Sequence, residues 1–233
     1  MSAEGANRLH DCLRAPFRDR ASAGRALAEI VLAKPGLSKP AVVALARGGV
    51  PVGAEVARSL GAPLLAMPVA KVGAPGQEEL ALGAVAAGGV TVFNEEVLDL
   101  LGLSSAEVEA LVGRAAAKMA AEWAAYHGDD QIPLAGRSVV VVDDGLATGA
   151  TMRAALESVR RQSPSRVLMA VPVAPPEALL ALAHLFDDYV CLVAPRHMQA
   201  VGAWYEDFTQ TTDEEVVEAL KELGPGARKG PIA

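Results

Sequence analysis

The sequence predicts an α/β fold in which helices cover both faces of a mostly parallel sheet. Short, wholly apolar runs, typical of strands buried on both faces, alternate along the chain with longer runs of helical periodicity. Glycine (22 residues) and proline (15 residues) separate these runs. Such an alternation favours parallel strands joined by helical crossovers. Because 52% of the 233 residues are apolar, intrinsic disorder is excluded.

The first half of the chain is divided by glycine and proline. Arg47-Gly48-Gly49 interrupts one apolar run, and Gly88-Gly89 divides another in two, which indicates a hairpin. The expected elements are a helix that starts near Arg18 and stops before Pro35, a strand over Ala41–Ala46, a helix over 50–61, a strand over Pro63–Val72, a polar loop over Gly73–Glu79 and a hairpin over Leu80–Phe93.

The second half continues the alternation of strands and helices. Two capping boxes, Ser104-x-x-Glu107 and Thr212-x-x-Glu215, mark the starts of helices. The expected elements are helices over Asn94–Gly102 and Ser104–His127, a strand over Ser138–Val142, a helix over Met152–Gln162, a strand over Arg166–Ala174, a helix over 175–185, a strand over Tyr189–Val193 and a helix over Asp213–Leu223. We expect residues 1–16 to form an N-terminal extension, residues 17–223 a single domain and residues 224–233 a C-terminal tail.

Composition limits the compartment and the partners. With 21 Lys and Arg against 28 Asp and Glu, the formal net charge is −7, which weighs against a nucleic-acid partner bound by bulk charge. Cys12 and Cys191 are too few and too far apart for a disulfide framework or a zinc site. The N-terminus is charged, unlike a signal peptide, and no uncharged stretch is long enough to span a bilayer. We therefore expect a cytoplasmic protein without a membrane partner.

The segment VVVVDDGLATGAT, residues 139–151, carries the clearest chemical signal. Its valines predict a buried strand, and Asp143 and Asp144 follow at the carboxyl end, where open α/β sheets bind ligands. The small residues from Gly145 to Thr151 then lead into a helix, and backbone N–H groups in such a loop bind phosphate. Carboxylates suit the hydroxyls of a ribose or a Mg²⁺ ion. The segment therefore predicts a sugar-phosphate site.

Other ligand-binding motifs fit these residues less well. A nucleoside-triphosphate P-loop needs a lysine, and none lies between Val139 and Met152. A dinucleotide fingerprint needs G-x-G-x-x-G, which GLATGAT does not supply. A phosphorelay receiver would explain the paired acids but not the Gly-Thr loop. A solvated Asp-Asp turn that caps a helix stays open as an alternative.

The same segment resembles the phosphoribosyl pyrophosphate (PRPP) signature of type I phosphoribosyltransferases. ALARGGVPVGAEVA resembles the pyrophosphate loop of that superfamily, and KVGAPGQEELALGAVAAGG and AVGAWYEDFTQTTDEEV resemble a bacterial subfamily of phosphoribosyltransferases predicted from sequence. The resemblance implies a Rossmann-like parallel sheet with helices on both faces, a flexible hairpin flap and a small hood. It brings no established acceptor.

The resemblance also implies roles for particular residues. Asp143 and Asp144 would be catalytic, binding the ribose hydroxyls with Mg²⁺ nearby. The groups expected around them are Ala147, Thr148, Gly149, Ala150 and Thr151 for the 5′-phosphate, Arg47, Gly48, Gly49 and Lys71 for pyrophosphate, and Pro195, Arg196 and Tyr205 for the acceptor. The Ala46–Arg47 bond is a candidate cis peptide, and Gly73–Glu79 would form the flap. Trp204 and Phe208 are expected to pack against the C-terminal helix.

Two classes of function compete. The first is a Mg²⁺-dependent enzyme that transfers the phosphoribosyl group of PRPP to an acceptor, with a nucleotide-like product and pyrophosphate. The second is a regulator that senses PRPP without turnover, and a hydrolase or phosphotransferase on the same fold is a third, weaker reading. A homodimer stays open. Pyrophosphate release across a panel of bases would separate the first two.

Overall fold

The computed structural model describes residues 17–127 and 132–227. The predicted N-terminal extension, residues 1–16, and residues 228–233 of the predicted tail lie outside this part of the chain.

A seven-stranded mixed sheet forms the centre of the molecule, with strand order β4-β3-β2-β1-β5-β6-β7. Five neighbouring strands, from β2 to β7, run parallel, and β3 and β4 are antiparallel. This confirms the predicted parallel sheet with an antiparallel hairpin. The strands are β1 (Ala41–Ala46), β2 (Leu64–Ala74), β3 (Gln77–Ala86), β4 (Val90–Phe93), β5 (Ser138–Val142), β6 (Arg166–Val173) and β7 (Asp188–Val193).

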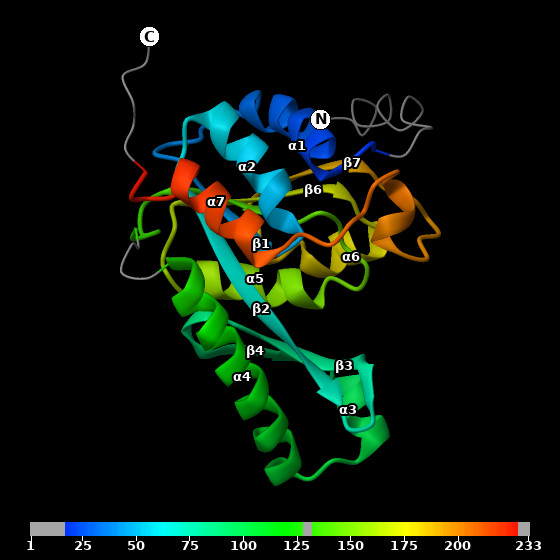
Figure 1. The fold of residues 1–233 in the computed structure, drawn as a ribbon. Coiled ribbons are helices and arrows are strands. Elements are labelled where there is room, and N and C mark those ends of the chain that lie inside the picture. The colour runs from blue at the N-terminus through cyan, green and yellow to red at the C-terminus, as the bar shows by residue number, and fades with distance from the viewer. Residues whose placement is uncertain (1–16, 128–131, 228–233) are drawn as a thin grey trace.

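Helices cover both faces of this sheet (Figure 1). The helices α1, α2 and α7 pack on one face, and α5 and α6 on the other, while the long α4 packs along β2 and β3. The helices are α1 (Arg20–Leu32), α2 (Gly49–Leu60), α3 (Glu95–Leu101), α4 (Ser105–His127), α5 (Ala150–Arg160), α6 (Pro176–Leu182) and α7 (Asp213–Leu223), with short 3₁₀ turns η1 (Ala87–Gly89) and η2 (Val201–Trp204). In the described part of the chain, no helix is long and apolar enough to cross a membrane.

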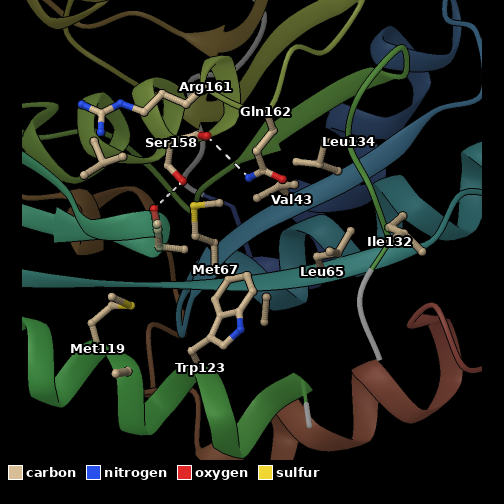
Figure 2. A pocket seen from close by; sticks show the side chains of 15 residues that line it. Val43, Leu65, Met67, Met119, Trp123, Ile132, Leu134, Ser158, Arg161 and Gln162 are labelled. Carbon is tan, nitrogen blue, oxygen red and sulfur yellow. Dashed lines mark hydrogen bonds between the residues drawn. The ribbon is translucent and has the colours of Figure 1, made fainter. Parts of the chain in front are cut away.

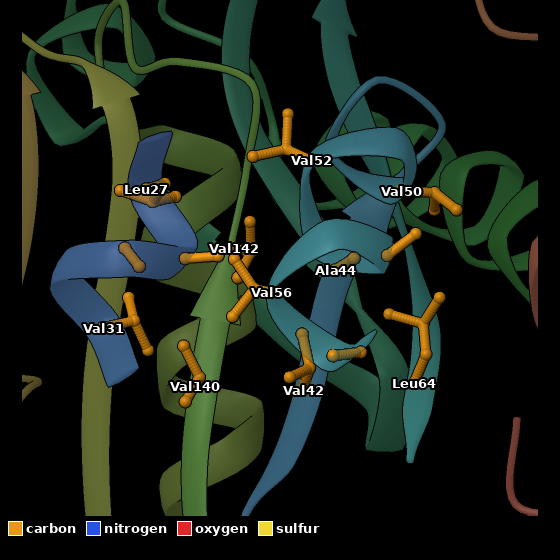
Figure 3. Packing of buried hydrophobic residues seen from close by; sticks show 14 of the residues in the cluster. Leu27, Val31, Val42, Ala44, Val50, Val52, Val56, Leu64, Val140 and Val142 are labelled. Atoms are coloured by element: carbon orange, nitrogen blue, oxygen red, sulfur yellow. The ribbon is translucent and has the colours of Figure 1, made fainter. Parts of the chain in front are cut away.

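The central strands are apolar throughout because both of their faces are buried. Val42 and Val140 point toward α1 and α2 (Figure 3), whereas Val43 and Val141 belong to the cluster under α5 and α6. Successive strand residues face opposite sides of a sheet, so a strand between two helical layers needs apolar residues at every position. This packing fixes the carboxyl ends of β1 and β5 side by side.

The predicted polar loop over Gly73–Glu79 is wrong. β2 continues to Ala74 and β3 starts at Gln77, so Pro75-Gly76 alone turns the chain, with Gly76 at φ 74°. The strands persist because Val72 and Ala74 are buried, together with side chains of α4. The chain therefore forms a long two-stranded ribbon braced by a helix in place of a loop.

Gly53 of α2 lies directly on β1, where an added Cβ would come 2.6 Å from the Cβ of Ala44. We expect Gly53→Ala to lower the free energy of unfolding by about 1–3 kcal/mol, because α2 must move off the sheet. Gly113→Ala in α4 is the matched control, since its Cβ meets nothing within 4 Å, and it is expected to raise stability by about 0.5–1 kcal/mol. Urea unfolding measures both changes. Equal stability of the two variants would contradict the packing described.

Candidate functional site

A cavity of about 910 Å³ opens where β1 and β2 leave the packed part of the sheet. Open α/β sheets bind ligands outside the carboxyl ends of their strands. The cavity walls come from the end of β1, the outer half of β2, one face of α4, the start of α5 and the segment before α7. The residues that line the cavity include Arg20, Arg47, Gly48, Val69, Lys71, Leu111, Arg114, Ala115, Lys118, Glu122, Asp143, Thr151 and Asp213.

The loop after β1 packs directly on the acidic pair. Its Ala46–Arg47 bond is cis, which confirms the expectation from the family resemblance. A Cβ on Gly49 would lie 2.9 Å from the carbonyl oxygen of Val142, and one on Gly48 would collide with the carboxylate of Asp144. Only glycine fits at these two positions, so the loop and the acidic pair form one compact unit.

The two carboxylates of the acidic pair are not equivalent. Asp143 lines the cavity, and its Oδ1 accepts a hydrogen bond from the backbone N–H of Asp144 at 2.9 Å. Asp144 is instead ion-paired with Arg20, with 2.7 Å between Oδ2 and Nε. In this structure one of the two predicted catalytic carboxylates therefore faces the cavity, and the other is held by a cation.

Arg20 of α1 is a site residue that the sequence interpretation missed. Besides the pair with Asp144, it donates a hydrogen bond to the carbonyl oxygen of Thr209 at 2.7 Å. Its guanidinium carbon lies 3.8 Å from the centre of the Phe208 ring, within the range of cation–π attraction. The side chain is only 10% exposed. No sequence signal marks it, because its partners lie far along the chain.

Burial governs the electrostatics of the acidic pair. Burial, together with the neighbouring Asp144 carboxylate, raises the pKa of Asp143 well above its usual value. Burial also raises the pKa of Asp144, against the opposing effect of Arg20. Asp143 is thus the member of the pair whose negative charge is less well compensated, and it faces the open cavity.

The predicted phosphate loop lies at the start of α5. Ala147 and Thr148 are exposed, and Thr151 lines the cavity. Gly149 has φ 79° and precedes the helix without any side chain that caps it. The first N–H groups of a helix have no partner within it, so this end can donate hydrogen bonds to a ligand anion. Ala150 belongs to the same first turn.

Cations surround the cavity from several elements. Lys71 of β2 is exposed, and Arg47 lies 3.6 Å from the carboxylate of Asp213. Asp213 in turn accepts a hydrogen bond from the Tyr126 hydroxyl of α4 at 2.5 Å, which links α4, α7 and the loop after β1. Two further cations, Arg114 and Lys118 of α4, line the cavity and were not predicted.

The predicted acceptor residues lie elsewhere in the structure. Tyr205 is buried between Phe17 and Phe208, with ring centres 5.5 and 5.0 Å away, and its hydroxyl donates to the backbone oxygen of Asp144 at 2.5 Å. Burial raises the pKa of Tyr205. The cavity lining does not include Tyr205, Pro195 or Arg196. Trp204 and Phe208 pack against the core around α1 and α7, as predicted.

The donor set of the cavity fits a weakly held magnesium ion. In the part of the chain that the structure describes, no three His, Cys, Asp or Glu residues gather as metal ligands. Mg²⁺ commonly takes one or two carboxylates and completes its shell with water and substrate phosphates. Asp143 could supply such a carboxylate, so Mg²⁺ would have to be bound largely through the ligand.

A second cavity, of about 430 Å³, lies between α4, α5 and the sheet. Trp123 and Met119 of α4 face Leu65 and Met67 of β2 in this space (Figure 2). The Ser158 hydroxyl at its edge is already bonded to the carbonyl oxygen of Ala87 at 2.8 Å. Among the residues that the structure describes, this cavity is lined by neither carboxylates nor a loop of the phosphate-binding kind, so the larger cavity is the candidate functional site.

Comparison with known proteins identifies the family of this chain. The family model described as "Phosphoribosyl transferase domain" matches residues 18–203. Two provisionally named phosphoribosyl transferases, from two strains of Mycobacterium tuberculosis, are each 42% identical over 205 residues, or 88% of this chain and 46% of the relative. The chain thus spans about half the length of these curated relatives.

A solved structure is similar over nearly its whole length. The crystal structure of the protein TT1426 from Thermus thermophilus superposes with a TM-score of 0.73 and 44% sequence identity, covering 90% of this chain and 99% of that one. The family match includes the acidic pair and both glycine loops of the cavity. The chain therefore belongs to the phosphoribosyl transferase domain family.

Proposed function

We propose that this protein uses PRPP and Mg²⁺ to transfer a phosphoribosyl group to a nitrogenous acceptor, with release of pyrophosphate. One observation carries the proposal: the Arg47-Gly48-Gly49 loop lies directly on the acidic pair, which in turn leads into the loop before α5. Two loops of the kind that binds phosphate therefore flank a carboxylate, and each contributes to the cavity lining, the first through Arg47 and Gly48 and the second through Thr151. This arrangement suits a ligand with a sugar between two phosphate groups.

Each loop has a distinct task in this proposal. The amides of Gly149, Ala150 and Thr151 hold the 5′-phosphate, and Asp143 accepts hydrogen bonds from the ribose hydroxyls. Arg47, the amides of Gly48 and Gly49, and Lys71 hold the pyrophosphate. These contacts fix the sugar so that its C1′ faces the open part of the cavity.

The reaction breaks the bond between C1′ and the pyrophosphate oxygen, and the electron pair leaves with pyrophosphate. Positive charge develops on the sugar ring, and the acceptor's lone pair forms the new bond to C1′. A carboxylate in a partly buried site stabilises such charge more strongly than water does, and Asp143 supplies it. When bound, Mg²⁺ would offset the negative charge of the pyrophosphate.

Arg20 acts through Asp144 in this scheme, as a positioning residue. It holds the Asp144 carboxylate against Gly48, and the Tyr205 hydroxyl holds the Asp144 backbone. The backbone N–H of Asp144 then fixes Asp143. The Asp143 carboxylate is therefore oriented by the buried Arg20–Asp144 ion pair behind it.

Asp143→Asn tests the ribose contact. We expect the variant to bind PRPP with Mg²⁺ at least about 100-fold more weakly, because the charged acceptor of the ribose hydroxyl hydrogen bonds, which also faces the metal, is gone. Isothermal titration measures the affinity, and Asp99→Asn on the exposed surface of α3 is the control. Unchanged binding by Asp143→Asn would refute the site assignment.

Turnover distinguishes an enzyme from a PRPP sensor. We expect pyrophosphate release from PRPP when a suitable purine, pyrimidine or pyridine acid is supplied. Release by the wild type and its loss in Asp143→Asn would support the enzyme. Binding of PRPP without release across the whole panel would favour the sensor.

The same substitution is expected to stabilise the free protein. The pKa of Asp143 is higher in the folded than in the unfolded chain, so the folded state binds more protons and stability falls as pH rises from about 4 through the folded-state pKa. Asp143→Asn removes this loss, about 1.4 kcal/mol for each unit by which the pKa is raised. Urea unfolding at about pH 4 and pH 8 measures it. A variant less stable than wild type at the higher pH would contradict this account.

Arg20→Ala leaves the Asp144 carboxylate buried without its cation. Removing one partner of a buried pair costs about 3–5 kcal/mol, and we expect a loss of this order near neutral pH. The loss should shrink as pH falls, because Asp144 can then take up a proton. Adding Asp144→Asn to Arg20→Ala should recover most of the stability, since no charge is then stranded. Without this recovery, the ion pair is not what holds α1 to the site.

A further inference from the structure

We infer that the acceptor carries an anionic group, a carboxylate or a phosphate, and that Arg114 and Lys118 of α4 bind it. This inference rests on the proposed function and names the class of acceptor that the same cavity takes.

The two cations lie on the face of α4 that lines the cavity. Five residues of α4 line the cavity, at spacings that put them on one face of the helix: Leu111, Arg114, Ala115, Lys118 and Glu122. Arg114 and Lys118 are the only lysine or arginine residues of the helix. Both therefore point toward the site, although most of the helix surface is available for solvated charges.

Both cations lack protein partners within the part of the chain that the structure describes. Neither Arg114 nor Lys118 forms an ion pair or hydrogen bond with any residue that the structure describes, whereas Arg20 and Arg47 of the same cavity pair with Asp144 and Asp213. Like charges four residues apart on a helix repel each other. An anion between them would remove the repulsion.

In the proposed function, PRPP already has its own binding groups. Arg47, the glycines after it and Lys71 come from the ends of β1 and β2, next to the acidic pair, while Arg114 and Lys118 belong to a separate wall. The volume of about 910 Å³ is near the upper end of the range for small-ligand pockets, about 300–1,000 Å³. The cavity thus has room for a second ligand beside PRPP.

Apolar residues complete this wall. Leu111 is half-buried beside the two cations, and Ala115 next to it is buried against β2. A flat heterocyclic ring could rest on Leu111 while its anionic group meets the cations. Glu122 lies on the same face of α4, so the charged residues of this wall leave a net charge of +1, while the chain as a whole has a net charge of −7. The positive wall is therefore a local feature and not a consequence of composition.

The test compares pyridine probes that differ in one substituent, which is neutral in one probe and anionic in the other two. Nicotinate, nicotinamide and pyridine-3-phosphonate are titrated into the wild type saturated with PRPP and Mg²⁺, and into Arg114→Gln/Lys118→Gln. We expect the wild type to bind at least one anionic probe about tenfold more tightly than nicotinamide, and the double variant to lose this preference. The carboxylate and phosphonate probes show which anion is preferred.

A matched control removes the same charge elsewhere. Arg25→Gln/Lys221→Gln changes exposed side chains of α1 and α7 outside the cavity and should retain the preference. PRPP affinity should change less than about threefold in both double variants. An absence of anion preference in the wild type would overturn the inference, as would a larger loss of PRPP affinity in Arg114→Gln/Lys118→Gln, which would assign the two cations to pyrophosphate. Failure of the wild type to bind PRPP would instead refute the proposed function.

Discussion

The site depends on one electrostatic constraint: two adjacent carboxylates lie partly buried at the carboxyl end of β5. Their charges repel each other, and burial makes both more costly. The fold compensates one of them with a guanidinium from α1 and leaves the other facing the cavity. Three features of the fold contribute to this asymmetric arrangement: the position of α1, the packing of the glycine loop against Asp144 and the aromatic residues behind Arg20.

The helix α4 gives the site its second wall and connects it to the remainder of the fold. It lies along the ribbon formed by β2 and β3, and its Tyr126 reaches Asp213 at the start of α7. Asp213 also contacts Arg47, so the loop after β1 is coupled to the end of α4. Movement of the ribbon against the sheet would therefore also displace the loop after β1.

Much of the fold could be predicted because its signals are local. Strands such as Ala41–Ala46 and Ser138–Val142 are continuous apolar runs, and the structure places them where the sequence predicted. The acidic pair and both glycine loops are contiguous motifs, so they too could be recognised. The β2–β3 ribbon was missed because its polar and small residues resemble a loop, and α4, which buries one side of it, begins only at Ser105, beyond β4 and α3.

The site residues that sequence did not reveal owe their role to tertiary contacts. Arg20 is an ordinary helical arginine until the fold brings it to Asp144, and Arg114 and Lys118 are ordinary surface cations until α4 turns them toward the cavity. Conversely, Tyr205 was expected to contact the acceptor, yet its ring is enclosed by Phe17 and Phe208. Periodicity and spacing do not report on such contacts between distant segments.

The segment before α1 is joined to the segment after η2 by the backbone. The N–H of Phe17 donates to the oxygen of Trp204, and the N–H groups of Glu206 and Asp207 donate to the oxygens of Phe17 and Arg18. This short parallel bridge holds Tyr205 and Phe208 behind the acidic pair. The beginning of the described chain thus supports the candidate site mechanically. Shortening the chain past Phe17 would loosen this site from behind without removing a residue of the cavity wall.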